Sequence, residues 1–273
     1  MDINTNLLEI VNEFSMLSDV EGILLGGSYG SKTSDENSDY DVYVYLTKEL
    51  SLKDRKRITD KCCSYIELNN TFWESEDDGI LKGCNIPIEI IYRNIEWIDS
   101  TLSRTLIKCE ADIGYTTCFW SNIINSEILY DKNDKLTSLK GKYNLPYPLK
   151  LKSNIIEKNY QLLKCKSPAY YYQIEKALKR EDFISINHRI AAFLASYFDI
   201  IFAINEFPHP GEKKILKIIK DNNFIIPKNM ESDIEKLLQC SIEKGNAILY
   251  KMDELIKNLD ILLENEGFSM KNR

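Results

Sequence analysis

Several features that mark common functional classes are scarce or missing in this chain of 273 residues. It has two histidines, and none of its seven cysteines forms a C-x-x-C pair, which argues against a zinc site or a disulfide framework. No apolar run approaches the roughly 18 residues that span a bilayer, so we expect no membrane segment. The N-terminus lacks a basic region followed by a small-residue cleavage site, so we expect a cytoplasmic protein.

A basic stripe is also missing, and the formal net charge is −7. A long nucleic-acid footprint needs such a stripe, so no nucleic-acid partner is expected. The negative charge is compatible with a cationic substrate but does not require one. Hydrophobic residues make up 44% of the chain and charged residues 28%, as in a globular protein with a sizeable core.

The N-terminal half shows a mixed pattern of hydrophobic spacing. Alternating or short apolar runs predict strands over residues 21–25, 40–46, 64–68 and 86–92, and helical spacing predicts helices over 3–17, 50–62, 95–109 and 116–124. The acidic stretch 72–83 lacks either period and is expected to be a loop.

Residues 131–153 are rich in Lys, Asn, Gly and Pro, which indicates a domain boundary. Beyond it, helical spacing predicts helices over 154–166, 168–180, 182–206, 211–222, 230–243 and 246–265. We therefore expect an α+β protein, with an N-terminal mixed-sheet domain of residues 1–148 and a C-terminal all-helical bundle of residues 149–273.

Three acidic residues in apolar surroundings are the clearest chemical signal. Asp39 and Asp41 lie on one face of the strand predicted over 40–46, where their mutual repulsion favours a bound cation. Glu89 interrupts an otherwise apolar strand, where a charge is costly unless it is paired or bound to a metal. Mg²⁺ prefers such oxygen ligands. The alternatives are solvated acids on an edge strand and, for Glu89, an ion pair with Arg93 or a lysine.

A glycine-rich turn precedes these acids. Gly26 and Gly27 permit backbone conformations that other residues resist, and they let a ligand approach closely. Backbone N–H groups of such a turn, together with the hydroxyls of Ser28 and Ser31, can bind phosphate. The spacing matches neither a P-loop nor a dinucleotide-binding fingerprint. A plain strand-to-loop turn is the alternative.

Gly27-Ser28, followed after about ten residues by Asp39-Tyr40-Asp41, resembles the signature of the polymerase-β-like nucleotidyltransferase superfamily. Glu89 fits the position of the third acid in that signature. Small bacterial members with a helical C-terminal domain, such as the aminoglycoside and lincosamide nucleotidyltransferases and their uncharacterised relatives, look most similar.

The resemblance implies Mg²⁺, with two ions expected, and ATP or another nucleoside triphosphate as co-substrate. It also implies transfer of AMP to a hydroxyl of a small acceptor, such as an aminoglycoside-type antibiotic, with release of pyrophosphate. Asp39, Asp41 and Glu89 would be the catalytic and metal-binding residues, and Glu89 would be either a ligand or the general base. Gly27, Ser28 and Ser31 would bind the nucleotide. Adenylylation of a protein by an antitoxin-type enzyme and non-catalytic nucleotide binding are the alternatives.

The helical half offers weaker candidates. Lys213 lies next to a predicted helix start, where it could bind phosphate of the nucleotide. Asp199 and His188 share a stripe of the predicted helix 182–206 and are expected to contact the substrate. For Asp199 the alternative is a structural pair with a lysine or tyrosine, and for His188 a place in the core. The sequence leaves the acceptor and the oligomeric state, monomer or homodimer, open.

Overall fold

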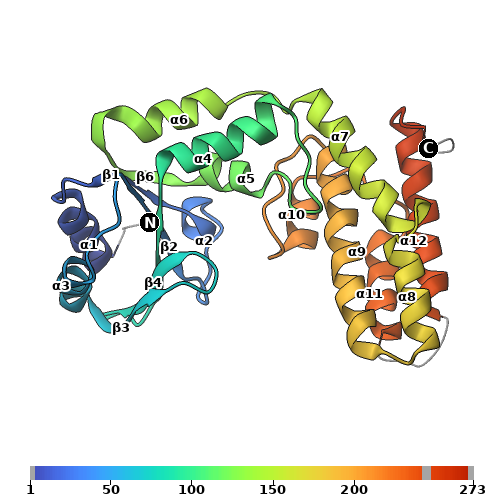
Figure 1. Cartoon of the computed structure of the whole chain (residues 1–273), viewed down its shortest axis with the longest axis horizontal. Coiled ribbons are helices and arrows are strands. Elements are labelled where there is room, and N and C mark those ends of the chain that lie inside the picture. The colour runs from blue at the N-terminus through green and yellow to red at the C-terminus, as the bar shows by residue number, and fades with distance from the viewer. Residues whose placement is uncertain (1–3, 242–246, 270–273) are drawn as a thin grey trace. The chain divides into compact units, whose positions relative to one another are not determined.

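The chain forms two compact units in the computed structural model (Figure 1), which describes residues 4–241 and 247–269. The first unit comprises the chain up to Arg104 together with Phe119–Pro146, and the second comprises Thr105–Cys118 and the chain from Tyr147 onward. A mixed sheet with helices precedes a helical region, which confirms the expected α+β class. The division into functional domains at residue 148 stays a prediction.

Within the described residues, six strands of the first unit form one mixed sheet in the order β3-β4-β5-β2-β1-β6. The strands are β1 (Val20–Leu25), β2 (Tyr40–Leu46), β3 (Cys63–Asn70), β4 (Ser75–Leu81), β5 (Pro87–Arg93) and β6 (Glu127–Asp131). β2 lies in the middle, parallel to β5 and antiparallel to β1. The chain therefore brings its second and fifth strands side by side.

One face of this sheet is covered by α1 (Thr5–Ser15) and α3 (Leu52–Cys62), and α2 (Gly27–Gly30) lies on the other side (Figure 1). Ile10 of α1 and Ile58 of α3 are fully buried in the same cluster as Val42 and Val44 of β2. Each such side chain contributes about 1.5–3 kcal/mol by leaving water. Because the apolar side chains of β2 fill this face, Asp41 lies on the opposite one.

The stretch 72–83, expected to be a loop, contains β4, so that prediction is wrong. Its backbone pairs antiparallel with both β3 and β5, the strands that precede and follow it in the chain. Asp77 lies in the core because the Arg55 guanidinium and the Tyr92 hydroxyl both donate hydrogen bonds to it, with Arg55 Nε 2.9 Å and Tyr92 Oη 2.7 Å from its carboxylate. An acidic residue can therefore occupy a buried strand when its partners are supplied by other elements.

Two further elements were not expected. β6 pairs with β1 at the end of the sheet, and α6 (Lys135–Tyr143) occupies much of the stretch interpreted as a linker. α4 (Ile95–Leu102) and α5 (Cys118–Asn125) are shorter than the helices predicted there. Thr105–Cys118, which follows α4 and includes the first residue of α5, belongs to the second unit.

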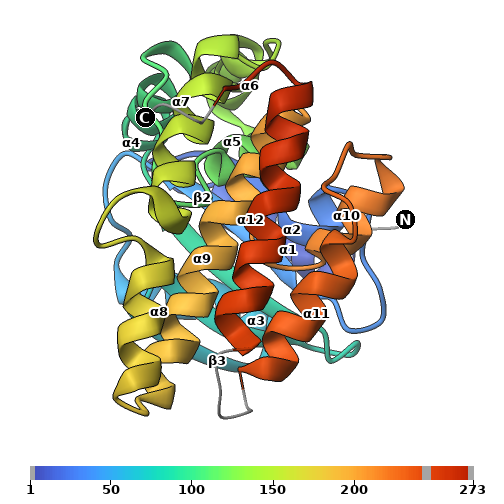
Figure 2. The same cartoon turned by 90° about the vertical axis from the view of Figure 1, so that its right-hand side faces the viewer.

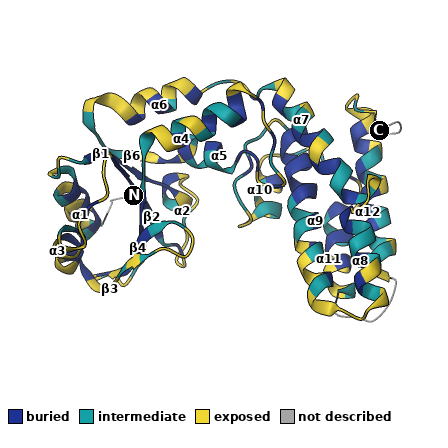
Figure 3. Cartoon of the chain, in the orientation of Figure 1, coloured by how far each residue is buried: buried dark blue, intermediate teal, exposed yellow. Residues whose placement is uncertain are grey.

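The second unit is helical (Figure 2). It contains α7 (Leu149–Tyr160), α8 (Tyr170–Lys179), α9 (Phe183–Ile204), α10 (Ile215–Asp221), α11 (Met230–Cys240) and α12 (Ala247–Asn265). α9 packs against α7 and α8, and α11 packs against α12. Residues 196–204 of α9 are buried all round (Figure 3), which confirms a central helix.

The helix predicted from residue 211 begins only at Ile215, so Pro210 does not occupy its first turn. The predicted helix ends at residues 3, 242–243 and 246 lie outside the described residues. None of the helices in the described ranges is long and apolar enough to cross a membrane.

Candidate active site

The predicted acids of the first unit are brought together by strand pairing. Asp41 of β2 is the direct cross-strand partner of Glu89 on the parallel strand β5. Paired residues on neighbouring strands point to the same face, and the strands lie roughly 4.8 Å apart. Asp39 immediately precedes β2 and, two residues from Asp41, shares its face. All three residues are half-buried.

The row of acids continues across two more strands. Asp78 of β4 pairs with Glu89, and Glu67 of β3 pairs with Asp78. Four carboxylates from four strands, Glu67, Asp78, Glu89 and Asp41, thus follow one line across the sheet, which we call the acidic row. Like charges directly opposite each other in a sheet are destabilising. The Asn70 amide offsets part of that cost by donating a hydrogen bond of 2.8 Å to Asp78.

Glu76 adds a further carboxylate beside the row. It pairs with Ile91 of β5, two residues from Glu89 on the same face, and only 7% of its surface is exposed. Burial raises its pKa, and the charges of Asp78, Glu89 and Glu74 raise it further. The sequence analysis missed Glu76 and Asp78 because it treated the acidic stretch 72–83 as a loop, and it missed Glu67 because that residue joins the row only by pairing with Asp78.

One cationic side chain, Arg93, bounds the acidic face toward the end of β5. The Arg93 guanidinium donates two hydrogen bonds to Glu74, of 2.7 and 2.6 Å. It also lies over the ring of Tyr43, 4.2 Å from the centroid. Burial raises the pKa of Tyr43 to about 12, and Arg93 and Asp41 act on it in opposite directions. Tyr43 stays neutral and accepts a hydrogen bond of 3.1 Å from Asn122. These contacts hold Arg93 with Glu74 and Tyr43.

The glycine turn lies directly against Asp41. The Gly26 N–H donates a hydrogen bond of 2.8 Å to the carbonyl oxygen of Asp41. Gly27 has a positive φ of 54°, and a Cβ built on it would lie 1.7 Å from Asp41 Oδ2. Only glycine avoids both the backbone strain and this overlap. The turn therefore presents bare backbone to the carboxylate.

The two serines of this turn differ in their hydrogen bonding. Ser28 Oγ is buried and has no hydrogen-bond partner among the described residues. Such a group is costly unless a ligand or water satisfies it. Ser31 Oγ donates to the Gly27 carbonyl oxygen at 2.9 Å and lies 2.9 Å from Thr33 Oγ1. Ser28 is thus the better placed to receive a ligand, while Ser31 closes its own turn.

The donor set suits a divalent cation by type, since Asp39, Asp41 and Glu89 offer carboxylate oxygens on one face. The bare backbone of Gly27 and the buried Ser28 hydroxyl add a cradle on the same side. However, no group of three or more His, Cys, Asp or Glu within residues 4–241 and 247–269 is arranged so that it could hold a metal ion. The three-carboxylate metal site therefore stays a prediction.

Asp199 in the second unit is a core residue, with 1% of its surface exposed. Thr116 donates to its carboxylate through both the backbone N–H, at 3.1 Å, and the hydroxyl, at 2.6 Å. Asn159 Nδ2 donates a third hydrogen bond of 3.1 Å. Burial raises the pKa of Asp199 to about 7, although these hydrogen bonds lower it. Its partners are neither lysine nor tyrosine, and substrate contact stays a prediction that would require these bonds to be exchanged.

The other two second-unit candidates are exposed. Lys213 lies in the turn that precedes α10, and His188 lies on α9, so His188 is not the core histidine of the alternative interpretation. Both roles stay predictions.

The second histidine, His209, is fully buried and was missed by the sequence analysis. Its backbone N–H donates to Thr117 Oγ1 at 2.7 Å, and its Nδ1 accepts from the Gly211 N–H at 3.1 Å. Burial lowers its pKa to about 4, so the ring is neutral at pH 7. Its position between two prolines gave no periodic signal that would have predicted burial. These bonds assign it a structural place beside Thr105–Cys118.

Comparison with known proteins gives limited information. A family model described as "Domain of unknown function (DUF4037)" matches residues 118–214, which is less than half of the chain. No curated protein matches the sequence.

Solved structures similar to this chain include the following three. One is a nucleotidyltransferase-like protein from Exiguobacterium sibiricum 255-15, with a TM-score of 0.43 and 13% identity, covering 96% of this chain and 76% of that one. Another is the Thermotoga maritima CCA-adding enzyme complexed with tRNA, with a TM-score of 0.32 and 11% identity over 99% and 85% of the two chains. A CCA-adding enzyme with ATP has a TM-score of 0.32 and 11% identity over 98% and 82%. Similarity at this level carries no functional argument. A function can therefore be argued only from the residues of the site.

Proposed function

We propose that this chain is a nucleotidyltransferase that transfers AMP from ATP, or another nucleoside monophosphate from its triphosphate, to a hydroxyl of a small acceptor. The observation that carries the proposal is the placement of Asp41, which is aligned with Glu89 on one side and packed against bare Gly27 on the other. Phosphoryl-type transfer depends on positioning and on neutralisation of charge, and a glycine cradle beside paired carboxylates suits both needs.

In this proposal the triphosphate lies at the turn, where backbone N–H groups and the Ser28 hydroxyl bind its oxygens. Asp39, Asp41 and Glu89 would hold one or two Mg²⁺ ions, which when bound neutralise phosphate charge. The acceptor oxygen forms a bond to the α-phosphorus, the bond from that phosphorus to the bridging oxygen breaks, and pyrophosphate leaves. The proton of the acceptor hydroxyl passes to a carboxylate, for which Glu89 is the candidate.

The acidic row also bears on the acceptor. Glu67 and Asp78 extend the line of negative charge away from the glycine turn, beyond Glu89. An acceptor that carries amino groups would bring its positive charges to these carboxylates, and an aminoglycoside-type antibiotic has that chemistry. In the second unit, the exposed Lys213 is the candidate for nucleotide phosphate and His188 for the acceptor, whereas Asp199 is already bonded to Thr116 and Asn159.

The proposal is tested by measuring pyrophosphate release with each nucleoside triphosphate over a panel of aminoglycosides, lincosamides and sugar alcohols, with Mg²⁺ and with a chelator. We expect one class of acceptor to support turnover only with the metal. Asp41→Asn should lower the rate by at least about 100-fold. Asp60→Asn, which alters a half-exposed acid on α3, is the matched control and should retain the rate.

Two results would contradict the proposal. If no acceptor releases pyrophosphate although ATP binds, the chain is a nucleotide-binding protein without this activity. If intact-mass measurement instead finds one AMP on a protein, the acceptor is not a small molecule.

A further inference from the structure

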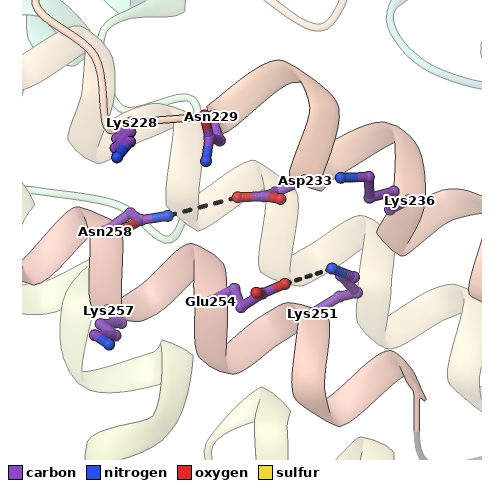
Figure 4. Close-up of a pocket in the computed structure, with 8 residues that line it drawn as sticks. All are labelled: Lys228, Asn229, Asp233, Lys236, Lys251, Glu254, Lys257 and Asn258. Atoms are coloured by element: carbon purple, nitrogen blue, oxygen red, sulfur yellow. Dashed lines mark hydrogen bonds and ion pairs between the residues drawn. The ribbon is translucent and has the colours of Figure 1, made fainter.

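A second concave site lies in the helical unit, between α11 and α12 (Figure 4). Its cavity has a volume of about 280 Å³. Its lining comprises Lys228, Asn229, Asp233, Lys236, Lys251, Glu254, Lys257 and Asn258. Lys251, Glu254 and Asn258 lie three and four residues apart on α12, so they share one face of that helix. The cavity is large enough for a small ligand but not for a folded partner.

Positive charge dominates this cavity, although the chain as a whole is acidic. Four lysines and two acids line it, and of the lysines only Lys251 forms an ion pair, with Glu254, among the described residues. Lys228, Lys236 and Lys257 come from the loop before α11, from α11 and from α12, and they are exposed. Three unpaired lysines around one cavity provide charge that an anion would neutralise.

The N-terminus of α11 adds to this positive character. Asn229 is its N-cap residue and lines the cavity, but its backbone is left-handed and its side chain does not cap the helix. The helix has 11 residues, and its positive end attracts anions.

The cavity also offers hydrogen-bond acceptors. Asp233 is 5% exposed, and its carboxylate points into the cavity, where Asn258 Nδ2 lies 3.5 Å from Oδ2 (Figure 4). That distance makes it a weak hydrogen bond, so this buried carboxylate has capacity to accept more. Hydroxyl groups are suitable donors for it. A ligand that fits both features has an anionic group for the lysines and hydroxyls for Asp233.

We propose that this cavity binds a small phosphorylated polyol, of the sugar-phosphate class, with its phosphate at Lys228 and Lys257 and its hydroxyls at Asp233. This inference does not rest on the proposed transferase activity. It uses only residues of the helical unit, and it predicts binding whether or not the first unit is an enzyme.

Calorimetric titration of the full chain with ribose 5-phosphate, inorganic phosphate and ribose tests the proposal. We expect saturable binding of ribose 5-phosphate, weaker binding of inorganic phosphate and no measurable binding of ribose. Lys228→Gln and Lys257→Gln should each raise the dissociation constant for ribose 5-phosphate about five- to tenfold. Lys179→Gln, on α8 outside the cavity, is the matched control and should leave it unchanged.

Asp233→Asn separates recognition of the hydroxyl groups by Asp233 from recognition of the phosphate by the lysines. It should weaken binding of ribose 5-phosphate without weakening that of inorganic phosphate. Unsaturable titration, or lysine variants that bind as tightly as the control, would overturn the site. Equal affinity for inorganic phosphate and ribose 5-phosphate would overturn the assignment to polyols.

Discussion

The two units treat their carboxylates in opposite ways. The first unit gathers them, so that Asp41, Glu89 and Asp78 face their like-charged neighbours across adjacent strands and remain half-buried. The second unit isolates one, Asp199, and surrounds it with three hydrogen bonds from Thr116 and Asn159. Both arrangements place acids in costly surroundings, and Asp199 receives three of these hydrogen bonds whereas Asp78 receives one from Asn70.

This difference distinguishes an acid held by several hydrogen bonds from acids that lie opposite like charges. A buried carboxylate with its acceptor sites filled fixes the packing, and here it attaches Thr105–Cys118 to the helices. A line of aligned carboxylates keeps a repulsion that a bound cation would relieve. Three experiments test this comparison; two of them neutralise an acid, one in each unit, and the third alters the glycine turn beside Asp41.

The largest expected effect on stability concerns Asp199. Its native pKa of about 7 lies above its ordinary value of 3.8, so the native state retains the proton between these values and stability decreases as the pH rises through 7. The free energy of unfolding of Asp199→Asn relative to wild type should rise by about 3 kcal/mol between pH 5 and pH 8. Denaturant titration of both proteins at a series of pH values measures it.

The relevant quantity is the difference in the free energy of unfolding between wild type and Asp199→Asn. Titration of His209 changes the stability of each protein with pH in the direction opposite to that of Asp199. The pKa of His209 is lowered to about 4, so its contribution increases as the pH rises toward 6.5, equally in both proteins. A pH-independent difference between wild type and Asp199→Asn would contradict the structural role assigned to this acid.

The next effect concerns the contact between the glycine turn and Asp41. Gly27→Ala should cost about 1–3 kcal/mol because φ is positive there, and the new methyl group should displace the Asp41 carboxylate. We expect reduced nucleotide binding together with a lower melting temperature. Gly141→Ala on α6 is the matched control, since nothing lies within 4 Å of its Cβ position and alanine favours a helix. If Gly27→Ala changes stability and nucleotide binding no more than Gly141→Ala does, the close approach of Gly27 to Asp41 is unimportant.

The smallest expected effect on stability concerns Glu76, beside the acidic row of the first unit. Glu76→Gln should stabilise the protein by about 1 kcal/mol at pH 7, because burial and the neighbouring charges of Asp78 and Glu89 raise the pKa of Glu76 and make its charge unfavourable. The gain should disappear near pH 4, where the wild-type side chain is protonated. Glu235→Gln, at an exposed position of α11, should change stability by less than about 0.5 kcal/mol. Destabilisation by Glu76→Gln would show that the carboxylate is bound to a partner.

Local patterns predicted much of the fold. The alternation in β2 and β5 and the 3.6-residue period of α1, α3 and α9 could be read directly, because they arise from backbone geometry within one element. The failure at β4 has a clear cause. β4 was missed because its acids, such as Asp77, are stabilised by Arg55 and Tyr92, which lie far from it in sequence.

For the site, the sequence identified Asp39, Asp41 and Glu89 as unusual but could not establish that β2 and β5 are neighbours. It also could not find Asp78 and Glu67, since these enter the acidic row only through the pairing of β3, β4 and β5. For Asp199 it correctly excluded an unpaired charge in an apolar helix, yet it named the wrong kinds of partner.

The sequence by itself determined that Gly27 and Ser28 follow one strand and that Asp39 and Asp41 share a face of the next, because both are consequences of chain order and of the two-residue period of a strand. Only the tertiary structure decided that Glu89 stands beside Asp41, that Gly27 lies against the same carboxylate, and that Asp199 binds Thr116. The reason is physical: strand order and buried hydrogen bonds depend on contacts between residues that are distant along the chain.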